Sequence, residues 1–224
     1  LGQELGLPFL GARYTHLYAN GNQFRNVLED LEVPSREYAD YWFGGGDAGD
    51  LYKLAFWFEF EDNNYSFGPI GATLEKFLGA DGQYKLARYR WCWQQRFGGT
   101  TANNLTNLFN LVYAVNATTT FVDRSEAVAD VEQWMRVMVY NRILGNWDAW
   151  GYGGGQNMFA YKPGPDRWKL LPWDIDFIFG LGGGPGEALW GGGDPVLNRM
   201  YDTPAFRRAL WRGYLDAVNG PLLP

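Results

Sequence analysis

The stretch YNRILGNWDAWGYGGGQNMFAYKPGPDRWKLLPWDIDFIFG, residues 140–180, predicts a helix that runs into a loop and then into a β-hairpin. Among the side chains along it that carry oxygen, the candidate ligands are Asp148, Asn157, Asp174 and Asp176. The rest of the chain has few of the side chains that enzymes ordinarily use. Candidate chemistry is therefore concentrated in this one unit.

An apolar stripe at helical spacing predicts the helix that enters the unit, and such a stripe faces a protein core. We expect Asp123 or Ser125 to cap this helix and Gly145 to end it, which leaves Asp148 in the following loop. We interpret the glycines at 151–155 as a mobile part of that loop. The stripe consists of Val131, Trp134, Met135, Met138 and Val139.

The hairpin is predicted from two short apolar runs, at 158–162 and 168–173, around the turn Pro163-Gly164-Pro165-Asp166. A second hairpin is predicted near the start of the chain, where residues 13–19 and 24–33 flank Asn20-Gly21. That dipeptide is typical of two-residue hairpin turns.

The remaining elements are one short helix, one strand and two later helices. Pro34-Ser35 opens a helix at 36–43, and the aromatic-rich run at 51–61 alternates like a strand. Residues 63–99 have no clear pattern. Strands first, and then helices with one embedded hairpin, indicate an α+β fold.

The two later helices are predicted at 101–115 and 204–218, from apolar residues at helical spacing. The glycine runs that begin at Gly180 and at Gly191 predict a flexible connector between the hairpin and the last helix. In that last helix, the residues expected to face inward are Phe206, Leu210, Tyr214 and Leu215.

Composition excludes several classes of function. The chain has 224 residues, 46% of them hydrophobic, enough for one folded domain or two tightly joined lobes. A net charge of −6 argues against nucleic acid, whose phosphates are bound by Lys and Arg. No apolar run is long enough to span a membrane. The chain opens at Leu1 without a signal peptide, and we expect it to be part of a longer protein.

The single histidine and the single cysteine exclude further chemistries. Zinc sites of thiolate and imidazole ligands need three or four such residues, and Ser–His–Asp or Cys–His nucleophiles need a histidine beside them. We expect His16 to lie at a rim or in packing, and Cys92 to be buried between Trp91 and Trp93. Hard-metal and carboxylate chemistry remains.

Asp174 and Asp176 would project together if the strand continues between them, because residues two apart in a strand face the same side, about 7 Å from each other. Two carboxylates that close repel unless a cation lies between them, and Mg²⁺ is such a cation. The alternative is a structural role, as a cap or in an ion pair with Arg142, Lys162 or Lys169.

The order of these residues also matters. Protein kinases place a catalytic Asp and a metal-binding Asn on a loop, and then run a hairpin to a second Asp that holds Mg²⁺. Asp148, Asn157 and the Asp174/Asp176 pair follow that order. The spacing differs, since nine positions separate Asp148 from Asn157 and no His-Arg-Asp motif is present.

At these residues the chain resembles the CotH kinase family, atypical kinases named for a bacterial spore-coat protein. The segments that carry the resemblance are GNWDAWGYGGGQNMFAYKP, WKLLPWDIDFIFG and, more weakly, LYANG and GDLYK. The resemblance implies one kinase-like domain over residues 1–224, with a β-rich lobe at 1–62 and a helical lobe at 63–224. It also implies ATP with Mg²⁺ or Mn²⁺ as cofactors, and Ser or Thr of a protein as the acceptor.

Carried over by position, the resemblance implies that Asp148 is the catalytic-loop Asp. It makes Asn157 a metal or loop-organising ligand, and Asp174 and Asp176 the metal end of the site. Lys53 of GDLYK is the candidate phosphate-facing lysine, the alternative being a solvated lysine on an edge strand.

Asn146, in the same loop, is a further candidate for cofactor binding. The family carries a basic segment with Arg-Gly and paired lysines that does not appear in this chain. If that segment contacts the nucleotide, this chain lacks part of the ATP site.

The resemblance also implies a secreted or cell-surface location, and the oligomeric state stays open. Two other functions compete with the kinase. One is a non-catalytic pseudokinase or binding module whose aromatic side chains bind a glycan or protein. The other, weaker, is a glycoside hydrolase that uses two carboxylates.

Overall fold

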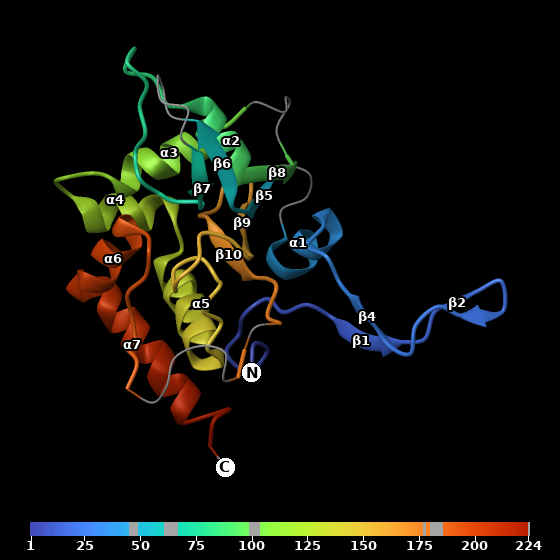
Figure 1. Cartoon of the computed structure of the whole chain (residues 1–224). Helices are drawn as coiled ribbons and strands as arrows, with labels where there is room; N and C mark the ends of the chain where they lie inside the picture. The colour runs from blue at the N-terminus through green and yellow to red at the C-terminus, as the bar shows by residue number, and fades with distance from the viewer. Residues whose placement is uncertain (45–48, 61–66, 99–103, 177, 180–185, 224) are drawn as a thin grey trace.

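The fold combines helices with small antiparallel sheets (Figure 1), which confirms the α+β expectation. The computed structural model describes residues 1–44, 49–60, 67–98, 104–176, 178–179 and 186–223, with the backbone alone at 57–60 and 67–70. Over these residues, no helix has both the length and the apolar character needed to cross a membrane.

A four-stranded antiparallel sheet lies at the centre, in the order β10-β9-β5-β8. Its strands are β5 (Asp50–Leu54), β8 (Trp93–Phe97), β9 (Met158–Lys162) and β10 (Lys169–Pro172). The predicted hairpin of the second half is therefore confirmed as β9 and β10. The predicted lobe border at residue 62 lies outside the described residues, and the sheet takes β5 from one side of it and three strands from the other.

The sheet is buried on both faces, because alternate residues of its strands enter two different clusters. Tyr52 and Leu54 join the large core, whereas Leu51 joins a smaller cluster with Tyr38 of helix α1. The helices around the sheet are α1 (Arg36–Phe43), α2 (Leu86–Cys92), α3 (Thr106–Val115), α4 (Phe121–Val128), α5 (Val131–Leu144), α6 (Pro195–Asp202) and α7 (Pro204–Val218).

Helix α5 lies between the sheet and α7 and supplies much of the large core (Figure 1). Its Gln133 also satisfies the outer edge of β10, since its amide donates to the Leu170 carbonyl at 2.6 Å and accepts from the Leu170 N–H at 2.9 Å. An edge strand with unpaired backbone groups can pair with another chain, and the Gln133 side chain occupies two of those groups.

Several sequence predictions are confirmed at the level of single residues. Helices α1 and α7 have the predicted bounds, Ser35 caps α1 by accepting from the Tyr38 N–H, and Gly145 ends α5 in the left-handed conformation. Cys92 is buried in the core at the end of α2.

The prediction for the start of α5 was wrong. Asp123 and Ser125 lie inside a separate helix, α4, and Asp130 is the cap of α5. The two helices are separate because Ala129 adopts an extended conformation between them. Asp130 accepts from the Gln133 N–H at 3.3 Å and also pairs with Lys169 of β10 at 2.7 Å.

Three other predictions need correction. The strand expected at 51–61 is two strands, since the chain leaves the sheet after β5 and forms β6 (Trp57–Phe60), which pairs with β7 (Phe67–Ile70). Leu215 is 55% exposed rather than inward, because it lies off the buried face of α7.

The segment at Gly191 is not a free connector. It leads directly into α6, which the sequence did not predict, and the side-chain amide of Asn198 bonds both the N–H and the carbonyl of Gly192.

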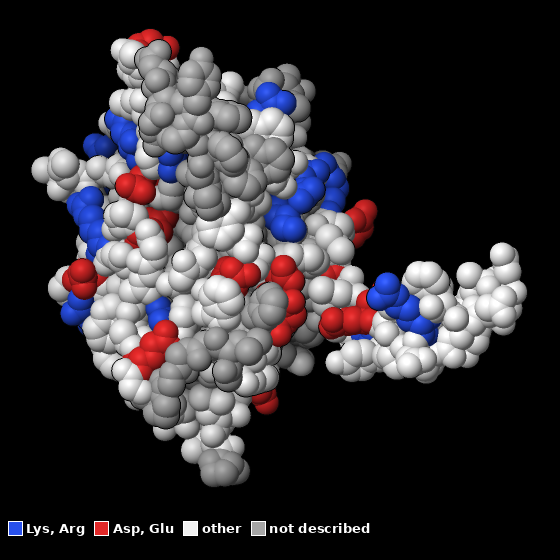
Figure 2. Space-filling model, viewed as in Figure 1, with Lys and Arg blue, Asp and Glu red and all other residues white. Residues whose placement is uncertain are grey.

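The N-terminal hairpin projects from the body as an arm (Figures 1 and 2). It consists of β1 (Ala12–Thr15) paired with β4 (Leu28–Leu31), extended by β2 (Tyr18–Ala19) and β3 (Asn22–Gln23). The predicted Asn20-Gly21 turn is confirmed, with both residues at positive φ. His16 is exposed on this arm and contacts the side chain of Gln23.

Asp130→Ala is expected to destabilise the protein by ~1 kcal/mol, because it removes the cap of α5. For a chain of this size, that corresponds to a fall in Tm of about 2–4 °C. Asp123→Ala, inside α4, is the matched control and should change stability by less than about 0.5 kcal/mol. Equal effects in thermal unfolding would contradict the assignment of the cap.

Candidate functional site

The candidate site lies at one end of the central sheet, where the hairpin opens. Pro172 of β10 is paired with Met158 of β9, so Asn157, before β9, and Asp174, after β10, belong to the same end. Lys53 of β5 faces Phe159 of β9, one residue from that end. The pairing register therefore brings three separate parts of the sequence together.

Asp148 is held by the two residues that precede β9. The Asn157 amide donates to Asp148 Oδ2 at 2.7 Å, and the Gln156 amide donates to Oδ1 at 3.0 Å and to Oδ2 at 3.1 Å. These bonds orient a half-buried carboxylate that is otherwise on a loop. The structure thus brings together Asp148 and Asn157, which the sequence had placed nine residues apart.

Gln156 is a site residue that the sequence reasoning missed. Its only signal in the sequence is its position beside Asn157, directly after the glycine run. The isolated bridge between Ala149 and Gln156, and the bond from the Trp150 N–H to the Gln156 carbonyl at 2.8 Å, fold the loop back on itself. That fold places the Gln156 side chain against Asp148.

Two of the candidate residues have an uncommon backbone conformation. Asn157 and Asp174 both have φ near 56°, a region that residues other than glycine rarely adopt, although Asn and Asp tolerate it best. Such conformations are concentrated at functional sites, where the surrounding structure holds them. Here Asn157 lies directly before β9 and Asp174 shortly after β10, so both are at the open end of the hairpin, near Asp148.

The left-handed conformation of Asp174 corrects one expectation. Strand β10 ends at Pro172, so Asp174 and Asp176 are not consecutive same-side residues of a continuing strand. They nevertheless lie close enough to interact. Partial burial, and then the Asp176 carboxylate, raise the pKa of Asp174; Asp148 adds to this effect, whereas Lys53 opposes it.

Lys53 is not on an edge strand, because β5 lies between β8 and β9. Its side chain is half-buried, and its ammonium group lies 5.8 Å from the centre of the Trp173 ring. A cation over an indole face is attracted to it. Lys53 is therefore a positive charge held beside the carboxylate of Asp174.

Asn146 is enclosed in the protein. Its backbone N–H donates to the Asn141 carbonyl at 2.9 Å, and its amide donates to Asn141 Oδ1 at 3.2 Å. Its side-chain oxygen is buried and has no hydrogen-bond partner among the described residues. The structure thus places Asn146 at the junction of α5 and the loop rather than on the cavity.

The glycines at 151–155 are required by close packing, which gives them a role other than mobility. A Cβ on Gly154 would overlap the backbone oxygen of Asp148, and one on Gly155 would overlap the backbone of Gly71. The Ala72 N–H also donates to the Gly155 carbonyl at 2.7 Å. The loop is therefore packed against its neighbours on both sides.

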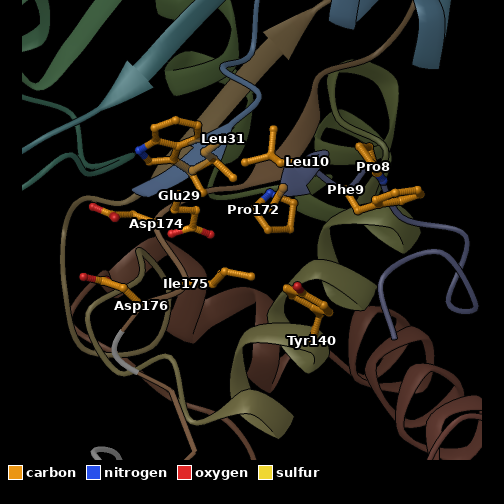
Figure 3. A pocket seen from close by; sticks show the side chains of 12 residues that line it. Pro8, Phe9, Leu10, Glu29, Leu31, Tyr140, Pro172, Asp174, Ile175 and Asp176 are labelled. Carbon is orange, nitrogen blue, oxygen red and sulfur yellow. The ribbon is translucent and has the colours of Figure 1, made fainter. Parts of the chain in front are cut away.

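A cavity of about 190 Å³ opens beside the two aspartates. Figure 3 shows Asp174, Asp176 and Glu29 on one side of it and apolar side chains on the other. The apolar lining comes from the N-terminal segment, the arm, α5 and the end of the hairpin: Pro8, Phe9, Leu10, Ala12, Leu31, Tyr140, Pro172, Trp173 and Ile175.

The donor set suits a hard divalent cation in part. Carboxylate and amide oxygens are the ligands that Mg²⁺ takes. A cation would relieve the repulsion from Asp176, which adds to burial in raising the pKa of Asp174. Over the described ranges, no three His, Cys, Asp or Glu side chains are placed to hold a metal by themselves. Asp174, Asp176 and the oxygen of Asn157 would need further ligands from a substrate or water.

The family model described as CotH kinase protein matches residues 1–223. The chain belongs to the CotH kinase family. The match covers both the arm and the candidate site, so the resemblance seen in the sequence is confirmed over the whole chain. A comparison with curated proteins returned no match. Membership of the CotH family indicates kinase-like phosphoryl transfer.

Asp174→Asn is expected to stabilise the protein slightly in EDTA at pH 7, with a rise in Tm of at most about 2 °C, because water screens this partly exposed carboxylate. The raised pKa of Asp174 means that its charge costs stability above the ordinary pKa of an aspartate. This gain should vanish below about pH 4, where the unfolded chain is protonated too. Thermal unfolding at both pH values checks the sign.

The same variant should lose any stabilisation by added MgCl₂ that the wild type has. Asp123→Asn, on an exposed position of α4, is the control and should leave both responses unchanged. A wild type that gains nothing from Mg²⁺ or Mn²⁺, with Asp174→Asn less stable than the wild type in EDTA, would contradict a cation site here.

Proposed function

We propose that this CotH-family chain is an ATP- and divalent-metal-dependent kinase that phosphorylates Ser or Thr of a protein substrate, within a divergent two-lobed kinase-like fold. The observation that carries the proposal is the Asp148 carboxylate, held by Gln156 and Asn157 at the sheet end that also carries Lys53 and Asp174.

Asp148 is the group that would orient the acceptor hydroxyl and take its proton. Phosphoryl transfer depends mainly on positioning and on charge stabilisation, so a carboxylate held by two amides suits this role. The bonds from Gln156 and Asn157 limit its rotation before any substrate binds.

Asp174 and Asp176, with the side-chain oxygen of Asn157, are the residues that would hold the metal. When bound, the divalent ion neutralises charge on the ATP phosphates. The positive charge of Lys53 lowers the pKa of Asp174, which indicates that the two side chains are close. A lysine in this place suits a phosphate-facing role. The apolar walls of the cavity would accept the less polar part of the nucleotide.

Asp148→Asn is expected to lower transfer of labelled phosphate from ATP to a protein acceptor by at least about 1,000-fold, because an amide cannot accept the hydroxyl proton. Binding of ATP with Mg²⁺, measured by calorimetry, should stay within about threefold of the wild type. Asp166→Asn, in the hairpin turn, is a control for folding. Undiminished transfer by Asp148→Asn would refute the assigned role.

A non-catalytic binding module is the second candidate, and the arm favours it. Tyr14, Tyr18 and Phe24 are 81%, 61% and 60% exposed there, and exposed aromatic rings can stack on sugars. Stabilisation by ATP with Mg²⁺ supports the kinase, whereas stabilisation by glycans without any response to nucleotide supports the module. A secreted or surface location, proposed from the resemblance, is compatible with either function.

A further inference from the structure

Asp194 is a buried carboxylate outside the candidate site, only 4% exposed. One oxygen, Oδ1, accepts from the N–H groups of Val196 at 2.8 Å and Leu197 at 3.2 Å, and so caps α6. The other, Oδ2, accepts from the Leu74 N–H at 2.9 Å and from the Trp150 indole N–H at 3.3 Å. The two oxygens therefore have separate tasks.

Capping α6 does not explain why this side chain is buried. Helix caps are usually short polar residues near the surface, and Ser or Asn serve as well as Asp. Burial raises the pKa of Asp194, and its hydrogen bonds from backbone N–H groups oppose that effect. Burying a carboxylate costs free energy unless both oxygens are hydrogen-bonded. The bonds to the second oxygen, which do not cap α6, therefore need a separate explanation.

The partner of that second oxygen, Trp150, is two residues from Asp148. Its ring packs edge-on against Trp93 and Trp134, with ring centres 5.9 Å and 6.0 Å away. Its backbone N–H donates to the Gln156 carbonyl, and the side-chain amide of Gln156 donates to the Asp148 carboxylate. A continuous series of contacts thus runs from Asp194 to Asp148.

A second contact from the same part of the chain supports this link. The Tyr201 hydroxyl of α6 donates to the Gly151 carbonyl at 2.9 Å, and Tyr201 is fully buried. Leu74, bonded by Asp194, is close in sequence to Ala72, which bonds Gly155. The loop that carries Asp148 is therefore bonded at Trp150 and Gly151 to Asp194 and α6, and at Gly155 to the segment 72–74, which Asp194 also bonds.

We propose that Asp194 is a positioning residue, which acts through the Trp150 indole to hold Gln156 and Asp148 in their working arrangement. Only the kinetic part of this inference rests on the proposed kinase function. The positional part concerns the loop itself and can be measured without any activity.

Trp150→Phe is the sharpest test, because it removes the indole N–H and keeps an aromatic ring in the core. Trp134→Phe is the matched control: its indole N–H is equally buried but donates to the Trp168 carbonyl at 2.9 Å, outside the loop. Its ring packs against the Trp150 ring, so this variant tests a change of packing without loss of the bond to Asp194. We expect Trp150→Phe to lower kcat by about 10- to 100-fold, with KM for ATP within about threefold. Trp134→Phe should leave kcat within about threefold of the wild type.

Amide hydrogen exchange supplies the readout that needs no activity. In Trp150→Phe, backbone amides of residues 147–157 should exchange at least about tenfold faster, whereas Trp134→Phe should leave them unchanged. Unchanged exchange and unchanged kcat in Trp150→Phe would overturn the inference. A wild type that transfers no phosphate would refute the kinase proposal and leave the exchange result as the test of this one.

Asp194→Asn tests the other end of the link, because an amide places an NH₂ group against one of the two donor pairs. If Asp194 acts through Trp150, the double variant with Trp150→Phe should be about as slow in kcat as the slower single variant. Independent effects, whose fold-changes multiply in the double variant, would show that Asp194 does not act through this bond.

Discussion

The pairing register of β10, β9 and β5 is the constraint on which the candidate site depends. It fixes where the hairpin opens relative to the middle strand, and so where Lys53, Asn157 and Asp174 meet. A slip by one residue would turn alternate side chains to the other face of the sheet. Both faces are buried against different clusters, and this burial specifies the register strongly.

The site itself is electrostatically and conformationally unfavourable, and the core around it is not. Asp174 lies near Asp176 and Asp148, and both Asn157 and Asp174 have left-handed backbones. The neighbouring core holds large aromatic side chains that are almost fully buried: Trp93, Trp134, Trp150 and Trp168. Functional centres typically lower the stability of the fold locally, and the surrounding core offsets that loss.

Much of this could be predicted from the sequence where a local signal exists. Ser35 before α1, Gly145 after α5 and the Pro-Gly turn between β9 and β10 each act on adjacent residues, and each prediction was confirmed. The roles of Gln156 and Asp194 depend on contacts between distant residues, which no local pattern reveals. The prediction of the α5 cap was wrong for a related reason. One extended residue, Ala129, divides a sequence pattern that is otherwise continuously helical.

The middle position of β5 also makes the candidate site depend on contacts between distant parts of the sequence. Its partners in β9 lie about a hundred residues later in the chain, and contacts so distant in sequence form slowly. Lys53 therefore cannot take its place beside Asp148 and Asn157 until β9 has been synthesised and has paired with β5. Lys53 joins the other candidate residues only where β5 pairs with β9, so the complete candidate site requires the complete sheet.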